Sequence, residues 1–122
     1  MDDEENMRSV AREMLVALGF RVTVAVDGQE AVLLYRQALT GGKPFDIVIL
    51  DLTVPGATGG LDTIQQLRDL DPRVSGVLSS GHTNHPAMER FAALGFQAAI
   101  AKPFTMEELG ATLAGVLRER QR

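Results

Sequence analysis

The sequence predicts an α/β protein built on a parallel β-sheet, and two observations support this prediction. Segments with apolar residues at the helical period alternate along the chain with short runs rich in β-branched residues. One of these runs, residues 45–52, is almost continuously apolar, as in a strand that helices cover on both faces. Strict alternation indicates βα units with right-handed crossovers. With 122 residues, the chain has the size of a single domain, residues 1–122.

In the first half of the chain, two amphipathic segments alternate with two β-rich segments. The first segment is followed by Gly19, a residue type that often ends a helix in the left-handed conformation. The β-rich run after it stops at Asp27 and Gly28, which is typical of a turn. The predicted elements are a helix over residues 5–18, a strand over 20–26, a helix over 30–39 and a strand over 45–52.

The second half continues the alternation after a loop at residues 53–60. The next helix ends before Pro72, because the residue before a proline is biased away from helical geometry. Thr105 and Glu108 have the spacing of a capping box, which marks the start of the last helix. The predicted elements are a helix over residues 61–70, a strand over 74–79, a short helix over 86–94, a strand over 97–101 and a final helix that begins after Thr105.

The composition excludes several classes of function. The chain carries 12 basic and 16 acidic residues, and its net charge of −4 predicts no diffuse attraction to nucleic acid or to an anionic membrane. No apolar run approaches the ~20 residues that cross a bilayer. The absence of cysteine removes disulfides and thiolate chemistry. Because the acidic residues 2–5 have the wrong charge for a signal peptide, we expect a cytoplasmic protein.

Residues that could carry chemistry stand where the predicted strands end. Asp51 ends one strand, Ser80 follows the next, and Lys102 ends the last. Asp2 and Asp3 stand where a preceding strand would end, at the edge that binds ligands in open parallel sheets. Clustered carboxylates repel each other unless a divalent cation lies among them, and hard oxygen ligands favour Mg2+. A carboxylate held beside a metal and an ammonium is also a candidate phosphoryl acceptor.

Together these motifs resemble the receiver domain of two-component response regulators over essentially the whole chain. The resemblance rests on intervals of 80 − 51 = 29 and 102 − 80 = 22 residues between the candidate positions. It implies a flavodoxin-like (βα)5 fold with sheet order 2-1-3-4-5, and it is greatest to receivers attached to hybrid sensor histidine kinases. The motifs that carry it are residues 2–6, the strand ending in Asp51, Pro55-Gly56, Ser80-Gly81 and Lys102-Pro103-Phe104.

The resemblance also implies a metal site and a function. Asp51 is similar in position to the phosphoacceptor, and Asp2 and Asp3 are similar to the acidic pair that binds Mg2+. Thr53 is similar to the residue that lends its backbone carbonyl to the metal. The implied function is Mg2+-dependent transfer of a phosphoryl group to Asp51 from the phosphohistidine of a histidine kinase or a histidine phosphotransfer domain. Such a module is not an enzyme beyond self-phosphorylation and autodephosphorylation, and it switches a partner-binding surface.

Two further residues are similar to the switching machinery of receivers, and one position departs from it. Ser80 is similar to the hydroxyl switch, and Lys102 is similar to the lysine that binds the phosphoryl group. Three positions before the lysine, many receivers carry an aromatic side chain that turns inward when the hydroxyl moves. This chain has Ala99 there, so the usual coupling between hydroxyl and aromatic is not expected.

The first strand of the family is expected to be truncated, because Met1 alone precedes the acidic pair. Its loss would leave residues 20–26 and 45–50 about 10 Å apart, with unpaired main-chain groups on both sides. Buried unpaired amides each cost about 1–3 kcal/mol, so we expect the gap to close. Either residues 20–26 pair directly with 45–52, or another chain supplies a strand in a homodimer or strand-swapped assembly, or the sequence is a truncation. The first two outcomes would displace Asp2 and Asp3 and weaken Mg2+ binding.

Three alternatives belong to other functional classes. A small haloacid dehalogenase-like phosphatase also uses a strand-end aspartate such as Asp51, but it needs a second acid two residues later, where this chain has Thr53. A flavodoxin-like FMN binder needs a hydroxyl-rich phosphate loop where this chain has the acids of residues 2–5. A truncated receiver could also serve as an interaction module alone.

Overall fold

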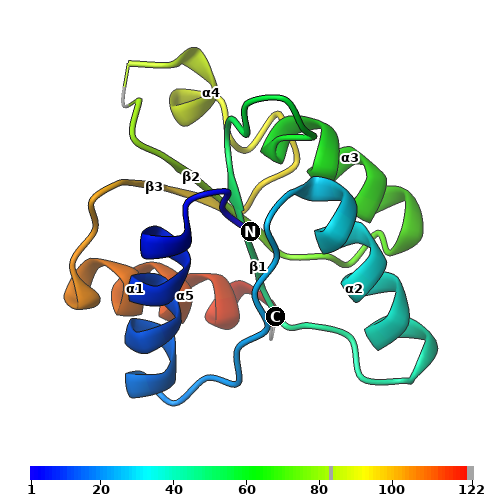
Figure 1. Ribbon diagram of the computed structural model, residues 1–122. Helices are drawn as coiled ribbons and strands as arrows, with labels where there is room; N and C mark the ends of the chain where they lie inside the picture. Colours follow the sequence, from blue (N-terminus) through cyan, green and yellow to red (C-terminus); the bar gives the residue numbers. More distant parts are fainter. Residues whose placement is uncertain (83, 121–122) are drawn as a thin grey trace.

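A parallel β-sheet between two layers of helices forms the centre of the computed structural model, which describes residues 1–82 and 84–120 (Figure 1). The sheet has the order β1-β2-β3, and both pairings are parallel. Asp51 lies opposite Ser79, and Ser80 lies opposite Ala101. The predicted parallel α/β fold is therefore confirmed. The strands are β1 (Val48–Asp51), β2 (Gly76–Ser80) and β3 (Ala98–Ala101).

The helices cover the two faces of the sheet. In Figure 1, α1 and α5 lie on one side of the strands, and α2 and α3 lie on the other. Each side has its own hydrophobic cluster: Val77, Leu109 and Leu113 belong to one, and Leu50 and Ile64 belong to the other. The helices are α1 (Glu5–Ala17), α2 (Gly28–Thr40), α3 (Gly60–Leu70), α4 (Pro86–Glu89) and α5 (Met106–Arg120).

Local signals in the sequence fix several helix ends. The Asp27 side chain accepts a hydrogen bond from the Glu30 amide at 2.9 Å, which caps α2. The predicted capping box is confirmed, because Thr105 Oγ1 accepts from the Glu108 amide and Glu108 Oε1 accepts from the Thr105 amide. Gly19 follows α1 with a φ of +96°, as predicted for a left-handed terminating residue.

The predicted strand over residues 20–26 is absent. This segment is extended chain that pairs with no strand in the described part of the protein. The prediction was wrong because β-branched residues favour an extended backbone, whereas a strand also needs a neighbour to pair with. As a consequence, β1 stands at the edge of the sheet. Val48 and Ile49 are half-buried, while every residue of β2 is buried.

The first of the three expected outcomes, direct pairing of residues 20–26 with residues 45–52, is also wrong. A cavity of about 660 Å³ lies between residues 20–26 and β1. It can persist because the cost of an unpaired amide applies to groups removed from water, and Arg21, Thr23 and Val24 are exposed.

The expected displacement of the acidic pair is wrong as well, because Met1 and Asp2 together form main-chain bonds to both sides of the gap near the carboxyl end of β1. The Met1 amino group donates to Ile49 O at 2.7 Å, and the Asp51 amide donates to Met1 O at 3.1 Å. The Asp2 amide donates to Ala25 O at 3.1 Å. These bonds hold Asp2 beside the end of β1 without a complete strand.

The short helix predicted over residues 86–94 ends earlier than expected. Helix α4 ends at Glu89, and residues 91–95 form turns that lead to Gly95, whose φ is +101°. In the described ranges, no helix is long and apolar enough to span a membrane.

Candidate functional site

Three carboxylates meet at the carboxyl end of β1. Asp51 is the last residue of β1, and Asp2 and Asp3 precede Glu4, the N-cap residue of α1. One carboxylate oxygen from each residue lies within 4.8 Å of the others. Asp51 is 6% exposed, whereas Asp3 is exposed. The cluster therefore opens to solvent on the side of Asp3, and its members repel each other electrostatically.

Lys102 brings a positive charge into this cluster from the end of β3. Its Nζ donates to Asp2 Oδ2 at 2.8 Å and to Asp51 Oδ1 at 3.1 Å. The Lys102 side chain is 14% exposed, so these bonds form largely away from water. One ammonium among three carboxylates leaves a net charge of −2, counting all four groups as ionised. That charge favours a divalent cation.

Burial and neighbouring charges shift the acid–base properties of the site. Burial raises the pKa of Asp51 above its usual value, and the hydrogen bond from Lys102 opposes this shift without cancelling it. Burial lowers the pKa of Lys102, but its hydrogen bonds to Asp2 and Asp51 outweigh this effect and raise that pKa overall. Burial lowers the pKa of the Met1 amino group to about 6, although Asp2 and Asp51 oppose the shift. Lys102 is thus charged at neutral pH.

The two remaining predicted residues lie next to this cluster. Ser80 is buried at the end of β2, and its Oγ accepts a hydrogen bond from the His82 amide at 2.9 Å. The Lys102 amide donates to Ser80 O at 2.8 Å, so main-chain pairing connects the two positions directly. Thr53 stands two residues after Asp51 with an exposed side chain.

Sequence reasoning missed a glycine that lets the next helix approach Asp51 closely. Gly60 is buried at the first position of α3, and its amide donates to Leu52 O at 3.2 Å. A Cβ added at Gly60 would lie 2.6 Å from Asp51 O, which is too close for any side chain. The adjacent pair Gly59-Gly60 was the signal in the sequence, since glycines often mark close backbone approach.

Comparison with known proteins identifies the family of this chain. Residues 1–114 match the response regulator receiver domain family. The chain belongs to this family. It is 31% identical over 121 residues to the transcriptional regulatory protein PrrA of Mycobacterium tuberculosis, covering 98% of this chain and 48% of the relative. It is 29% identical over 119 residues to the uncharacterized transcriptional regulatory protein YkoG of Bacillus subtilis, covering 98% of this chain and 50% of the relative. The receiver domain thus spans about half the length of these relatives.

Solved structures have the same fold. The receiver aligns with the crystal structure of a CheX–CheY complex with BeF3 and Mg2+ from Borrelia burgdorferi at a TM-score of 0.85 and 22% identity, covering 95% of this chain and 84% of that one. It aligns with the chemotaxis protein CheY4 of Vibrio cholerae at a TM-score of 0.81 and 26% identity, covering 94% and 92%. The predicted receiver of two-component signalling is confirmed, a signalling module rather than a classical enzyme. Its attachment to a hybrid sensor kinase stays a prediction.

Proposed function

We propose that this receiver domain accepts a phosphoryl group on Asp51 from a phosphohistidine of a histidine kinase or a histidine phosphotransfer domain. The observation that carries the proposal is the position of the Asp51 carboxylate. It is buried at a strand end, 3.1 Å from the Lys102 ammonium and within 4.8 Å of two further carboxylates. A carboxylate in this setting is a nucleophile whose negative charge neighbouring groups can balance while it reacts. In this proposal, residues 1–122 act as a single receiver domain.

The residues around Asp51 fit a resident Mg2+ ion. Asp2, Asp3 and Asp51 offer carboxylate oxygens close enough to share one cation, and such hard oxygen donors match Mg2+. We assign the backbone carbonyl of Thr53 as a further ligand. When bound, the ion would neutralise negative charge on the oxygens of the transferring group.

The chemistry of the transfer is a displacement at phosphorus. An Asp51 carboxylate oxygen forms a bond to phosphorus while the phosphorus–nitrogen bond to the donor imidazole breaks. The imidazole leaves with the electron pair of that bond and takes a proton from solvent or from its own protein. The Lys102 ammonium, which already lies at Asp51, would pair with phosphoryl oxygens, so charge stabilisation is present before the reaction begins.

Ser80 is assigned the role of reporting the adduct to the surface. Its hydroxyl accepts from the His82 amide, and its carbonyl accepts from the Lys102 amide. A turn of this hydroxyl toward a phosphoryl group would release the His82 amide and free the loop after β2. Since Ala99 has no ring to turn inward, we place the response in that loop, where the chain would contact partners.

Acetyl phosphate with Mg2+, followed by intact mass measurement, tests the proposal. A single labile phosphoryl adduct at Asp51 supports a receiver that takes phosphate from small donors as well as from phosphohistidine. Continuous turnover of many phosphate esters would instead indicate the phosphatase alternative. A stable mass without any adduct, in the presence of Mg2+ and a phosphorylated histidine phosphotransfer domain, would favour a module used for interaction alone.

A further inference from the structure

Lys102 reaches Asp51 across the middle strand of the sheet. Strand β2 lies between β1 and β3, and neighbouring strands are about 4.8 Å apart, so the backbones that carry the two residues are separated by about 10 Å. The Lys102 Nζ nevertheless lies 3.1 Å from Asp51 Oδ1 and 2.8 Å from Asp2 Oδ2. The lysine side chain therefore passes over the carboxyl end of β2.

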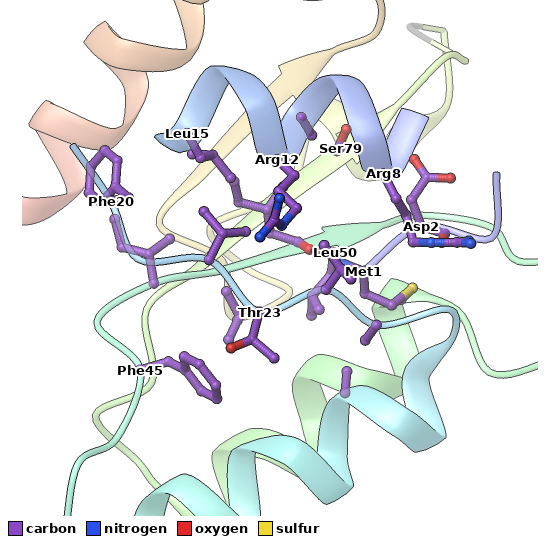
Figure 2. A pocket seen from close by; sticks show the side chains of 18 of the residues that line it. Met1, Asp2, Arg8, Arg12, Leu15, Phe20, Thr23, Phe45, Leu50 and Ser79 are labelled. Carbon is purple, nitrogen blue, oxygen red and sulfur yellow. Dashed lines mark hydrogen bonds between the residues drawn. The ribbon is translucent and has the colours of Figure 1, made fainter. Parts of the chain in front are cut away.

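Ser79 is the β2 residue that shares a face of the sheet with both groups. It lies opposite Asp51 on one side and opposite Ile100 on the other. Residues that lie opposite each other in a parallel pair point to the same face, and side chains two positions apart along a strand do so as well. Lys102 follows Ile100 by two positions, and its amide continues the ladder by donating to Ser80 O. Figure 2 shows Ser79 on the side of the sheet that α1 covers.

The Ser79 hydroxyl has no hydrogen-bond partner among the described residues. The residue is 4% exposed, and its Oγ is fully buried. The two other buried serines of the same segment differ from it, since Ser75 Oγ accepts from Arg120 at 2.9 Å and Ser80 Oγ accepts from the His82 amide at 2.9 Å. Buried polar side chains in folded proteins nearly always have partners. An exception beside a charged cluster therefore indicates a group that forms its bond in another state of the site.

Lys102 has a hydrogen to donate to this hydroxyl. An ammonium carries three hydrogens, and the bonds to Asp2 and Asp51 use two of them. Both bonds would weaken when the carboxylate cluster holds Mg2+, because the dication repels the ammonium and draws carboxylate oxygens toward itself. Water is a poor substitute partner, since the Lys102 side chain is only 14% exposed. The serine oxygen has two lone pairs to offer and lies on the strand that the lysine crosses.

We propose that Ser79 is a positioning residue for Lys102: while the carboxylates hold Mg2+, the Ser79 hydroxyl accepts a hydrogen bond from the Lys102 ammonium and keeps it beside Asp51. The ammonium then stays where it can pair with the oxygens of a transferring phosphoryl group, instead of turning to solvent. Ser79 itself touches neither the metal nor the phosphoryl group. This inference rests on the proposed function, because it gives Ser79 a part in the same Mg2+-dependent reaction at Asp51.

NMR of isotope-labelled lysine ammonium groups tests the proposal without any phosphorylation. The chain has two lysines, and Lys43 is exposed in a loop, so it provides an internal reference. In the original chain, we expect Mg2+ to shift the Lys102 signal while exchange of its ammonium hydrogens with water stays slow. In Ser79→Ala, exchange should be equally slow without Mg2+, when Asp2 and Asp51 still hold the ammonium, and about tenfold faster with it.

Two matched variants separate positioning from a general loss of packing. Ser79→Thr keeps a hydroxyl on the same carbon and should restore slow exchange in the presence of Mg2+. Ser75→Ala removes a buried hydroxyl just before β2, at the opposite end from the carboxylates, and should leave exchange at Lys102 unchanged. Faster exchange in Ser79→Ala both with and without Mg2+ would indicate a looser fold and overturn the proposal. So would slow exchange in Ser79→Ala with Mg2+ bound, or a Lys102 signal in the original chain that Mg2+ does not shift.

Rates of phosphorylation by acetyl phosphate at saturating Mg2+ give a second readout. Ser79→Ala should react about tenfold more slowly than the original chain, but its loop after β2 should still respond to the adduct, because that response is assigned to Ser80. In a Lys102→Ala background, the same substitution should change the rate by less than about twofold, since a residue that acts through the lysine has nothing left to position. A tenfold effect without Lys102 would assign the hydroxyl to the metal or the phosphoryl group and overturn the proposal.

The two readouts separate this inference from the proposed function. Absence of an adduct on Asp51, together with exchange at Lys102 that depends on Ser79 and Mg2+, would contradict the proposed function and support the contact between Ser79 and Lys102. A normal adduct, together with exchange that is independent of Ser79, would overturn the positioning role alone.

Discussion

The Lys102 ammonium lies 3.1 Å from the Asp51 carboxylate, although 51 residues separate them in the chain. The parallel sheet explains this proximity, because β1 and β3 flank β2 and both end at the same edge. The connection does not depend on any strand between residues 20–26 and β1. The reactive part of the site is therefore built from β1, β2 and β3, whereas the acidic pair depends on the bonds of Met1.

The Asp51→Asn substitution should abolish the phosphoryl adduct and stabilise the fold at neutral pH. Because burial raises the pKa of Asp51, the folded protein binds this proton more tightly than the unfolded chain does. The free energy of unfolding therefore falls as pH rises from the unfolded pKa of 3.8 through the higher pKa of the folded protein, because Asp51 then ionises in its buried site. The gain from Asn should disappear below that pH, where the carboxyl is protonated in both states.

Intact mass and urea denaturation between about pH 3 and pH 7 measure the two effects of Asp51→Asn. Asp46→Asn is the matched control, because Asp46 is exposed just before β1 and lies outside the carboxylate cluster. An adduct of full intensity in Asp51→Asn would show that another residue is the acceptor.

Lys102→Ala should slow phosphorylation by acetyl phosphate about 10²-fold, the usual effect of removing one preorganised charge or donor from a transition state. The fold should survive when Mg2+ is present, since the cation can replace the ammonium among the carboxylates. Stopped-time mass measurements give the rate. Lys43→Ala, which removes the other lysine at an exposed position, should phosphorylate at the original rate. Equal slowing in both variants would contradict a specific role for Lys102.

Ser80→Ala should leave the rate of phosphorylation within about threefold of the original, since one neutral hydrogen bond is worth about 1 kcal/mol. The substitution should suppress the conformational change in the loop after β2 that follows phosphorylation. The readout is hydrogen exchange in the loop after β2 with and without the adduct. Ser79→Ala provides the comparison, because Ser79 Oγ is buried without a hydrogen-bond partner among the described residues. If Ser80→Ala slowed phosphorylation as strongly as Lys102→Ala, the separation of their roles would be wrong.

Tyr35→Phe should destabilise the fold by about 1 kcal/mol at neutral pH, because it removes a hydrogen bond to a carboxylate. Tyr35 is 1% exposed and donates to Asp71 Oδ2 at 2.6 Å. The same bond lowers the pKa of Asp71 in the folded protein. The stability that this bond contributes is therefore complete above the unfolded pKa of 3.8 and is lost as pH falls through the lower folded pKa. Urea denaturation of both proteins should therefore converge in acid. A difference independent of pH would assign the loss to packing instead.

The sequence predicted those parts of the fold that depend on local pattern and strand order. The positions of Asp51, Ser80 and Lys102 at strand ends followed from the βα alternation, and the structure brings Asp51 and Lys102 together as predicted. The state of residues 20–26 could not be predicted, because pairing depends on a neighbour that their own side chains do not specify. The retention of Asp2 was missed for a similar reason, since it follows from main-chain bonds of Met1 that leave no side-chain pattern.

A strand added at the start of this chain would fill the cavity between residues 20–26 and β1. Adding about six apolar residues before Asp2, enough for one strand, should tighten Mg2+ binding and speed phosphorylation. In the present chain, Asp2 is held by Met1 bonds at the edge of an open cavity, so part of the binding energy must be spent on ordering this segment. The extension also replaces the Met1 amino group, whose pKa burial lowers to about 6, by a peptide amide that stays neutral at every pH. Mg2+ titrations of both chains, each repeated with Asp51→Asn, measure the difference. Equally tight binding that depends on Asp51 in both chains would show that the Met1 contacts alone organise the acidic pair and that the first strand is dispensable for the metal.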